Sequence, residues 1–343
     1  MSPIPRFTAL VQRAAREHIP LDVSIELTNR CNHRCAHCYI PDFDAPDGIS
    51  TDRILRLLDE LAELGTLFLA LTGGEPLLRR EWPVIAHRAR QLGFHVMLLT
   101  NGALIDEETA DRIAELALQA RISFHSADPS VFDRITGSPG SFDRVLAGVE
   151  RLARRHAAVE LTVPITALNR DAASTVPELA RRLGVEYHVY TTLFAKKDGN
   201  ATPLQLRLSA EEAVVLLERG SSLCVLPDEE TGRIDRDEPL CAAGVRYAAI
   251  SASGDVRACE ILPGIAGNIN QTSFREIWQN APWFQRLRSI TPRDLHVCST
   301  CPKLNYCGRC HAQALVEDGD LLGPSRQACA YAQARERLAR RHA

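Results

Sequence analysis

The sequence predicts an α/β protein in which parallel strands alternate with helices, followed by a separate cysteine-rich part. Two patterns support this prediction. Short apolar, β-rich runs alternate six times with helical stretches, and six successive β/α units imply a parallel sheet. The cysteines are unevenly placed: three precede residue 40, none lies between residues 39 and 223, and eight follow from residue 224. With 343 residues, the chain is long enough for one large barrel or two domains.

Composition and charge narrow the class of protein. Charged residues make up 24% of the chain and hydrophobic residues 45%, which is typical of a soluble globular protein. The formal net charge of -3 gives no indication of a nucleic-acid partner. No run of about 18 apolar residues and no signal-peptide pattern occurs, so we expect no membrane partner. Eleven cysteines without a signal peptide favour a reducing, cytoplasmic location in which thiols bind metal.

The expected elements follow along the chain. Residues 1–20 are expected to form an N-terminal arm or short helix. A helix at 51–63 has apolar residues near a 3.6-residue period, a cap at Ser50 or Thr51 and a stop at Gly65. Further helices are expected at 106–118, 141–155 and 173–183, and a helix at 209–219 leads into the cysteine-rich part. The six strands are expected at residues 21–27, 67–71, 94–100, 121–124, 159–165 and 185–190.

Three cysteines, Cys31, Cys35 and Cys38, lie within eight residues directly after the first expected strand. In sheets of this kind the loops beyond the carboxyl ends of the strands carry the chemistry. Thiolates are the soft ligands of iron-sulfur clusters, and three of them leave a fourth position open. From this stretch alone, a zinc knuckle with a distant fourth ligand and a redox thiol group remain alternatives.

The spacing C-x3-C-x2-C, with His37 before the last cysteine and Tyr39 after it, resembles the signature of the radical S-adenosylmethionine (SAM) superfamily. The resemblance implies a partial (β/α)6 TIM-type barrel over residues 21–208. It also implies a [4Fe-4S] cluster on the three cysteines whose open iron binds SAM, with Tyr39 among the cofactor-binding residues. In that family SAM is cleaved reductively to a 5'-deoxyadenosyl radical, which abstracts a hydrogen from the substrate.

Gly73, Gly74, Glu75 and Pro76 follow the second expected strand. Consecutive glycines let a backbone approach a ligand closely, although the motif taken alone is also typical of a plain turn. After the second strand of a chain with this cysteine motif, it resembles the GGEP motif of the same family. The resemblance implies that the backbone of this loop and Glu75 hold the amino group of SAM.

Three further strand ends supply expected SAM contacts. Asn101 lies in a Thr-Asn-Gly turn after the third strand, similar to the turn that relatives have at this place. Ser123 matches the residue that contacts the ribose in the family, whereas His125 and Ser126 replace the aspartate and glycine that many relatives carry. Thr162 on the fifth strand is expected to flank the adenine, and a place in an apolar core strand is the alternative for it.

Seven of the eight C-terminal cysteines lie between residues 241 and 329, four of them in a C-x2-C-x5-C-x2-C block. Their order resembles the SPASM extension of radical SAM peptide maturases, which carries two auxiliary [4Fe-4S] clusters, and implies such a domain over residues 209–343. The last spacing is x2 where the family usually has x3, and a zinc ribbon is the alternative for the block alone. By this resemblance the outer cluster is held by Cys298, Cys301, Cys307 and Cys329, and the inner cluster by Cys241, Cys259 and Cys310.

Two residues extend this interpretation. Glu260 directly follows Cys259, where sulfatase-maturing relatives place an acidic residue proposed as a catalytic base. A surface or structural carboxylate is the alternative for it. Cys224, the eleventh cysteine, either completes the inner cluster or is an inert buried thiol that leaves one iron open. Its apolar neighbours favour the buried thiol.

The sequence therefore predicts a radical SAM enzyme that oxidatively modifies a peptide or protein, and our first hypothesis is cross-linking of a ribosomally made precursor. A sulfatase-type maturase that forms formylglycine is the second hypothesis, and a non-enzymatic iron-sulfur or zinc protein that passes electrons is the third. The expected partners are a peptide or protein substrate and an electron donor such as flavodoxin or ferredoxin. Only about 20 residues precede the first strand, so we expect leader recognition by a separate protein or by the barrel surface.

Overall fold

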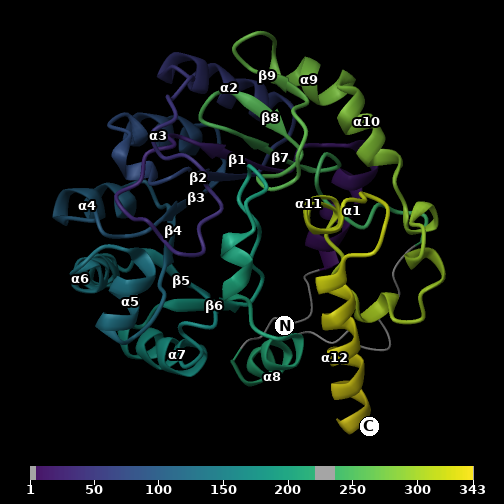
Figure 1. Cartoon of the computed structure of the whole chain (residues 1–343). Coiled ribbons are helices and arrows are strands. Elements are labelled where there is room, and N and C mark those ends of the chain that lie inside the picture. Colours follow the sequence, from purple (N-terminus) through teal and green to yellow (C-terminus); the bar gives the residue numbers. More distant parts are fainter. Residues whose placement is uncertain (1–4, 221–235, 343) are drawn as a thin grey trace. The chain divides into compact units, whose positions relative to one another are not determined.

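The computed structural model describes residues 5–220 and 236–342, which divide into two compact units (Figure 1). Each unit combines a part of the predicted β/α region with a part of the cysteine-rich region. The domain boundaries after residues 20 and 208 therefore stay predictions. The first unit consists of Met1–Cys31, Asp42–Leu99 and Cys241–Ile290, and the second of Asn32–Pro41, Thr100–Leu240 and Thr291–Ala343.

The first unit is built on one sheet. Its strands are β1 (Asp22–Glu26), β2 (Phe68–Thr72), β3 (His95–Thr100), β7 (Tyr247–Ile250), β8 (Asp255–Arg257) and β9 (Gly267–Asn268). Their order in the sheet is β3-β2-β1-β7-β8-β9. The first three run parallel, β7 pairs in parallel with β1, and β8 and β9 continue in antiparallel pairs. The short strands β7 to β9 are not among those predicted from the sequence, and through β7 the cysteine-rich part of the chain joins the sheet directly.

The helices of the first unit agree with the sequence where it made a prediction. They are α1 (Pro5–Glu17), α2 (Thr51–Glu63), η1 (Pro76–Leu78), α3 (Trp82–Gln91), α9 (Phe274–Asn280) and α10 (Pro282–Ser289). The side chain of Ser50 caps α2 by accepting a hydrogen bond from the amide of Arg53, and Gly65 follows the helix with a φ of +89°. Phe7 of α1 contacts Phe68 of β2, with 6.1 Å between the ring centroids. The N-terminal arm is therefore a helix that packs at the amino end of β2.

The second unit contains the other three predicted strands, β4 (Gln119–Ser123), β5 (Ala158–Pro164) and β6 (Glu186–Tyr190). They are all parallel, in the order β6-β5-β4. The six parallel strands predicted from the sequence are thus all present, and the α/β fold class is confirmed. Its helices are α4 (Glu107–Glu115), α5 (Pro129–Thr136), α6 (Ser141–Arg154), α7 (Ala172–Leu183), η2 (Thr202–Leu206), α8 (Ala210–Gly220), η3 (Pro292–Asp294), η4 (Cys298–Thr300), η5 (Leu304–Tyr306), α11 (His311–Asp318) and α12 (Arg326–His342).

The long C-terminal helix α12 packs against α8, as Figure 1 shows. Ala210 and Val214 of α8 form a small buried cluster with Ala334 of α12. The helix is thereby held beside the end of the β/α region. No helix in the two described ranges combines the length and the apolar character that a membrane span requires.

The strands of the second unit have an apolar face and a polar face. Ile122 of β4 and Leu161 of β5 are buried on the face that the helices cover. On the other face Arg121 and Glu160 form an ion pair at 3.2 Å. Because successive side chains of a strand point to opposite faces, Ser123, two residues after Arg121, lies on the polar face as well. This alternation presents polar side chains at the carboxyl ends of the strands.

Candidate active site

The two loops that follow β1 and β2 are joined by their backbones. The carboxyl ends of these strands meet at the same edge of the sheet because the strands are parallel and in register. The amide of Gly74 donates a hydrogen bond to the carbonyl of Thr28, and that of Glu75 to the carbonyl of Arg30, both at 2.8 Å. The GGEP loop therefore fixes the backbone that leads directly into Cys31.

The glycines of this loop are required by that close approach. A Cβ atom on Gly73 would lie 2.3 Å from the carbonyl oxygen of Thr28, and one on Gly74 would lie 2.3 Å from the carbonyl oxygen of Arg30. Gly73 also has a φ of +135°, which side-chain-bearing residues rarely adopt. The structure shows close approach of this loop to the backbone that precedes Cys31, and the close approach to a ligand stays a prediction.

Glu75 is fully buried at the end of β2. Its Oε1 accepts a hydrogen bond from the amide of Leu77 at 3.1 Å and so caps η1, in which Pro76 takes the first position. The side chain of Glu75 is therefore fixed in a single place beside the cysteine loop. Its contact with the amino group of SAM stays a prediction.

Cys35 and Cys38 lie in the second unit, on a segment that is held by the end of α5. The amides of Arg34 and Ala36 donate to carbonyl oxygens of the last turn of α5 at 2.8 Å and 2.9 Å. A turn bond from the amide of Cys38 to the carbonyl of Cys35, at 3.0 Å, closes the loop. Cys31 is four residues before Cys35, so the chain itself limits their Cα separation to about 14 Å.

Asn101 contacts the cysteine loop directly. Its Nδ2 donates to Oδ1 of Asn32 at 2.7 Å, and Asn32 lies between the first two cysteines of the motif. Its own Oδ1 accepts from the amide of Ala103 at 3.0 Å, which keeps the turn after β3 in shape. Gly102 completes that turn with a φ of +78°. Asn101 is thus placed to orient the loop, whereas its contact with SAM stays a prediction.

Tyr39 packs against the loop that follows β6. The amide of Lys197 donates to the carbonyl of Tyr39 at 2.9 Å, and Nζ of Lys197 lies 5.3 Å from the centroid of the tyrosine ring. Burial raises the pKa of the Cys38 thiol, while a backbone hydrogen bond from Ile40 and the charges of Lys196 and Lys197 lower it. The loop after β6 therefore supplies positive charge beside an expected cluster ligand, whose thiolate it favours.

Ser123 and Thr162 lie next to each other on the polar face of the sheet. The register pairs Ser123 of β4 with Thr162 of β5, and Thr162 with His188 of β6. The Oγ1 atom of Thr162 is buried and has no hydrogen-bond partner among the described residues. A buried hydroxyl without a partner costs about 1–3 kcal/mol, so this place fits a polar ligand such as the nucleoside part of SAM.

His125, which replaces the aspartate that many relatives carry, is buried against the cysteine loop. Its ring meets that of His37 edge-on, with 5.0 Å between the centroids. Burial lowers the pKa of His37 to about 4 and that of His125 well below its usual value, so both rings are neutral. Asn169 donates from Nδ2 to the carbonyl of His125 at 2.6 Å. The sequence indicated that this loop differs from the family, but not that the histidine reaches His37.

The four expected ligands of the outer cluster lie in the second unit and act on one another. Burial raises the pKa of Cys307 to about 11, and the thiolates of Cys329, Cys298 and Cys301 contribute in the same direction. Burial also raises the pKa of Cys298 and that of Cys329, whereas the charge of Arg309 lowers both. Within the described ranges no three His, Cys, Asp or Glu side chains converge as they would on a single metal ion. Four thiolates fit a [4Fe-4S] cluster, in which each thiolate binds its own iron.

Two expected ligands of the inner cluster, Cys241 and Cys259, flank β7 and β8 in the first unit. Burial raises the pKa of Cys259 to about 12. Its sulfur accepts a hydrogen bond from the amide of Leu262 at 3.2 Å, as the sulfur of a cluster ligand commonly does. The third, Cys310, precedes α11 in the second unit. Cys224 lies outside the described residues.

Glu260, the candidate base, is held by two hydroxyl groups of the first unit. Its Oε1 accepts a hydrogen bond from Oγ of Ser24 on β1 at 2.5 Å and a second one from the hydroxyl of Tyr247 on β7. Burial and the charge of Glu260 both raise the pKa of Tyr247, which therefore stays protonated as a donor. The sequence gave no indication of Ser24 or Tyr247, because their roles depend on the pairing of β7 with β1.

A cavity of about 300 Å³ lies at the carboxyl end of β6, and we call it the β6 cavity. Burial raises the pKa of Tyr190 at its wall to about 12, and the thiolate charge of Cys35 contributes in the same direction. The cavity is therefore bounded on one side by a residue near the SAM-cluster motif and on the other by an expected inner-cluster ligand. Its lining includes Tyr190, Thr191, Cys310, Gln313, Tyr331 and Arg335.

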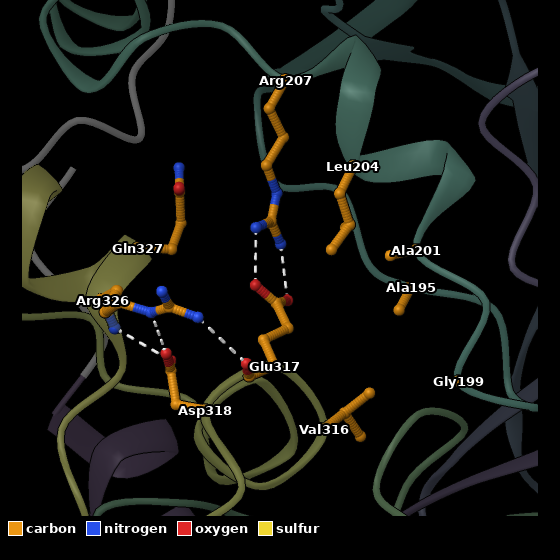
Figure 2. A pocket seen from close by; sticks show the side chains of 10 residues that line it. All are labelled: Ala195, Gly199, Ala201, Leu204, Arg207, Val316, Glu317, Asp318, Arg326 and Gln327. Carbon is orange, nitrogen blue, oxygen red and sulfur yellow. Dashed lines mark hydrogen bonds and ion pairs between the residues drawn. The ribbon is translucent and has the colours of Figure 1, made fainter.

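A second cavity, of about 460 Å³, lies between the loop after β6 and the end of α11 (Figure 2). Two ion pairs line it. Arg207 meets Glu317 through two hydrogen bonds of 2.6 Å, and Arg326 pairs with Asp318. Both arginines of this cavity are thus neutralised by carboxylates of the protein itself.

Sequence comparison identifies the class of protein that this fold and these cysteines define. Residues 25–183 match the radical SAM superfamily, and residues 241–302 match SPASM, an iron-sulfur cluster-binding domain. The chain belongs to the radical SAM superfamily and carries a SPASM domain. It is an enzyme whose cofactors are SAM and iron-sulfur clusters.

Two curated relatives cover most of the chain. A PqqA peptide cyclase of Xanthomonas axonopodis pv. citri is 31% identical over 325 residues, which are 88% of this chain and 85% of the relative. An AdoMet-dependent heme synthase of Methanosarcina barkeri is 29% identical over 336 residues, which are 90% of this chain and 96% of the relative. Relatives of this similarity thus act on more than one kind of substrate.

Among solved structures, SuiB of Streptococcus suis bound to the precursor peptide SuiA is similar in fold. The TM-score is 0.75 at 16% sequence identity, over 96% of this chain and 82% of SuiB. SuiB has also been crystallised with S-adenosylmethionine. The similarity confirms the radical SAM fold predicted from the cysteine and GGEP motifs.

Proposed function

We propose that this enzyme oxidatively modifies a peptide or protein, and that it forms a cross-link in a ribosomally made precursor. The observation that carries the proposal is the β6 cavity. Its wall contains Cys310 and also Tyr190, whose pKa is raised in part by the thiolate charge of Cys35. A substrate in this cavity would lie between the SAM-cluster motif and the inner-cluster motif. The likeness to a PqqA peptide cyclase and to SuiB with its peptide supports a peptide as that substrate.

The cofactor residues are proposed from the geometry of the loops. Cys31, Cys35 and Cys38 would hold the SAM cluster. Bound SAM and a reduced cluster supply a 5'-deoxyadenosyl radical, which is chemistry that no side chain offers. The protein binds and orients SAM and the substrate, and it excludes water from the site. In this scheme Glu75 and the GGEP backbone hold the methionyl part of SAM, and the unpartnered hydroxyl of Thr162 receives the nucleoside part together with Ser123.

A cross-link removes two hydrogen atoms from the substrate. One leaves as a hydrogen atom to the SAM-derived radical, and the other leaves as a proton and an electron. The proton needs an acceptor: Glu260 is the candidate from the sequence, whereas its hydrogen bonds with Ser24 and Tyr247 favour a positional role and a proton that leaves to solvent. The electron needs an acceptor too, and Cys241, Cys259 and Cys310 would hold an iron-sulfur cluster that could accept it. Both hydrogen atoms and the electron that leave the substrate are thus accounted for, and the reaction needs no oxidant besides SAM and the inner cluster.

The proposal includes partners that the structure does not contain. Flavodoxin or ferredoxin would reduce the SAM cluster, and a separate protein or the barrel surface would recognise the leader of the precursor. A cytoplasmic location follows from the need for reduced thiols.

One observation favours a second candidate substrate. The heme synthase relative matches over 96% of its own length, so the whole chain is comparable with that enzyme. A haem precursor is therefore the alternative substrate. The sulfatase-type reaction on Cys or Ser is the other alternative, and it also uses a peptide.

The experiment incubates the reconstituted holoenzyme anaerobically with dithionite, SAM and one candidate substrate at a time. The candidates are a precursor peptide encoded beside this gene, a sulfatase peptide that contains Cys or Ser, and an iron coproporphyrin. We expect a product of the precursor peptide that lacks two hydrogen atoms, formed together with 5'-deoxyadenosine. A product from the porphyrin or the sulfatase peptide alone would contradict the proposal and select the corresponding alternative.

A further inference from the structure

We propose that Arg335 binds a carboxylate group of the substrate in the β6 cavity. The proposal rests on the function proposed above and adds a chemical feature of the substrate to it. Arg335 lies on α12 and lines the cavity together with Gln313 of α11, beside Cys310. A substrate anchored there by an acidic group would be held next to the inner-cluster motif.

No carboxylate of the described residues balances the charge of Arg335. Its contacts with described residues are a hydrogen bond of 3.2 Å to the carbonyl of Tyr306 and the ring of Tyr331, whose centroid lies 6.0 Å from its guanidinium carbon. No carboxylate oxygen of the described residues lies within 4 Å of it. A half-buried guanidinium without an anion favours an anionic ligand strongly.

Three other arginines of α12 differ from Arg335 in having a carboxylate partner. Arg326 pairs with Asp318, Arg337 with Glu211 and Arg340 with Glu336. These arginines are exposed to solvent, yet each has a carboxylate partner. Arg335 lines a cavity and has none among the described residues, and a carboxylate of the substrate is the partner that we propose for it.

A second side chain of the cavity also lacks a partner. Gln313 is only 5% exposed, and its amide makes no side-chain hydrogen bond to another described residue. The polar atoms of this amide are not fully buried, so they are accessible from the cavity. Its NH2 group is a donor, and a carboxylate accepts several hydrogen bonds at once. Arg335 and Gln313 together therefore match a carboxylate better than a cation or an apolar group.

An alternative role for Arg335 is to neutralise the thiolate charges of the outer-cluster cysteines, and its surroundings do not support that role. Arg309 is the arginine that hydrogen-bonds Cys298. None of the four outer cysteines is among the residues that line the β6 cavity. The larger cavity in Figure 2 shows the opposite arrangement, because Arg207 and Arg326 are both occupied by carboxylates there. Of these two cavities, only the β6 cavity offers an arginine that pairs with no carboxylate of the described residues.

Two sources could supply the carboxylate, namely an acidic residue of a peptide and an acidic side chain of a haem precursor. The test has one arm for each. In the first arm, immobilised holoenzyme with SAM is exposed anaerobically to short synthetic peptides in matched pairs that differ only in Glu or Gln at one position. Mass spectrometry then quantifies the bound members. In the second arm, fluorescence titration compares coproporphyrin III with its tetramethyl ester.

We expect the wild-type enzyme to bind the acidic member of its preferred pair about tenfold more tightly than the neutral member. Arg335→Gln should reduce this ratio to near one, and Arg335→Lys should keep part of it. Arg340→Gln on the same helix should keep all of it. A loss of structure is excluded by the iron content and by the far-UV circular dichroism spectrum of Arg335→Gln, which should match those of the wild type.

The outcomes separate this inference from the proposed function. An acid preference in the peptide arm that Arg335→Gln removes supports both. The same result in the porphyrin arm alone supports the role of Arg335 and overturns the peptide function. Peptide binding without an acid preference in the wild type, or a preference that survives in Arg335→Gln, overturns the role of Arg335 and leaves the peptide function standing. No acid preference in either arm also overturns it.

Discussion

Ser24 and Glu260, 236 positions apart in the chain, are joined by a hydrogen bond of 2.5 Å between Oγ and Oε1. Tyr247 donates its hydroxyl to the same oxygen atom. Since β1 and β7 pair in parallel, both hydroxyls are presented by neighbouring strands of one sheet. The contact ties the residue after Cys259 to the first strand of the fold, and it gives Glu260 a positional role that the sequence could not show.

The two roles of Glu260 predict different results for Glu260→Gln. The amide of glutamine keeps an oxygen that can accept both hydroxyl hydrogen bonds, so the positional role predicts product formation within about threefold of the wild type. This is the outcome that we expect. Glu260→Ala should destabilise the fold by about 1–3 kcal/mol, because it leaves both hydroxyls without their acceptor. The readouts are product formation and the thermal unfolding midpoint under anaerobic conditions.

If Glu260 were instead the base in the rate-limiting step, its substitution would give a different result. Glu260→Gln would then lower turnover by about 10² to 10⁴ without a change in stability or iron content. That combination would assign the proton transfer to Glu260 and reject a purely positional role.

Gly74→Ala should disrupt the SAM cluster. Its Cβ would lie 2.3 Å from the carbonyl of Arg30, and backbone can only make room by moving the segment before Cys31. We expect a loss of about four irons per chain and no SAM cleavage. Gly93→Ala is the matched control, since nothing lies within 4 Å of its Cβ and only the φ of +88° disfavours alanine, at a cost of about 1 kcal/mol. Equal effects of the two substitutions would show that the close approach is unimportant.

His125 should make stability depend on pH. Burial lowers its folded-state pKa well below the ordinary value of 6.5, and the unfolded chain therefore takes up a proton that the folded one does not. Stability is then fully present above pH 6.5 and is lost as the pH falls below it, by up to about 1.4 kcal/mol per pH unit for one such group. His125→Gln should flatten the fall of the unfolding midpoint between pH 7 and 5.5, whereas His87→Gln, at an exposed position of α3, should not. Equal slopes in all three proteins would contradict a buried neutral His125.

The iron content tests the role of Cys224. Three [4Fe-4S] clusters correspond to about 12 irons per chain, and on the buried-thiol hypothesis Cys224→Ala leaves that number unchanged. A loss of about four irons, with the spectra of the other clusters preserved, would show instead that Cys224 is a ligand of the inner cluster.

Much of the fold followed from local patterns in the sequence. Alternating β-rich and helical stretches predicted all six parallel strands, and the cap at Ser50 and the stop at Gly65 are found as predicted. Such features depend on residues a few positions apart. The strands β7 to β9 were missed because they are very short and become strands only by pairing with β1 and with one another.

The site was predicted less completely, for a similar reason. The motifs located Cys31, Gly74 and Asn101. In the first unit Gly74 hydrogen-bonds the backbone before Cys31, and in the second unit Asn101 hydrogen-bonds Asn32. The contacts of His125 with His37 and of Ser24 with Glu260 join residues that are far apart in the chain and belong to no motif. Arg335 was not singled out either, because an arginine among many on a C-terminal helix is distinguished only by its missing carboxylate.

The most direct test of the radical SAM assignment is SAM cleavage by a variant in which Cys31, Cys35 and Cys38 are all replaced by Ala. The reconstituted protein is incubated anaerobically with SAM and dithionite, and 5'-deoxyadenosine and iron are both measured. We predict that the wild type forms 5'-deoxyadenosine, and that the variant forms none while it keeps about eight irons on its C-terminal cysteines. Reductive cleavage of SAM by the triple variant, or none by a fully loaded wild type, would contradict the account.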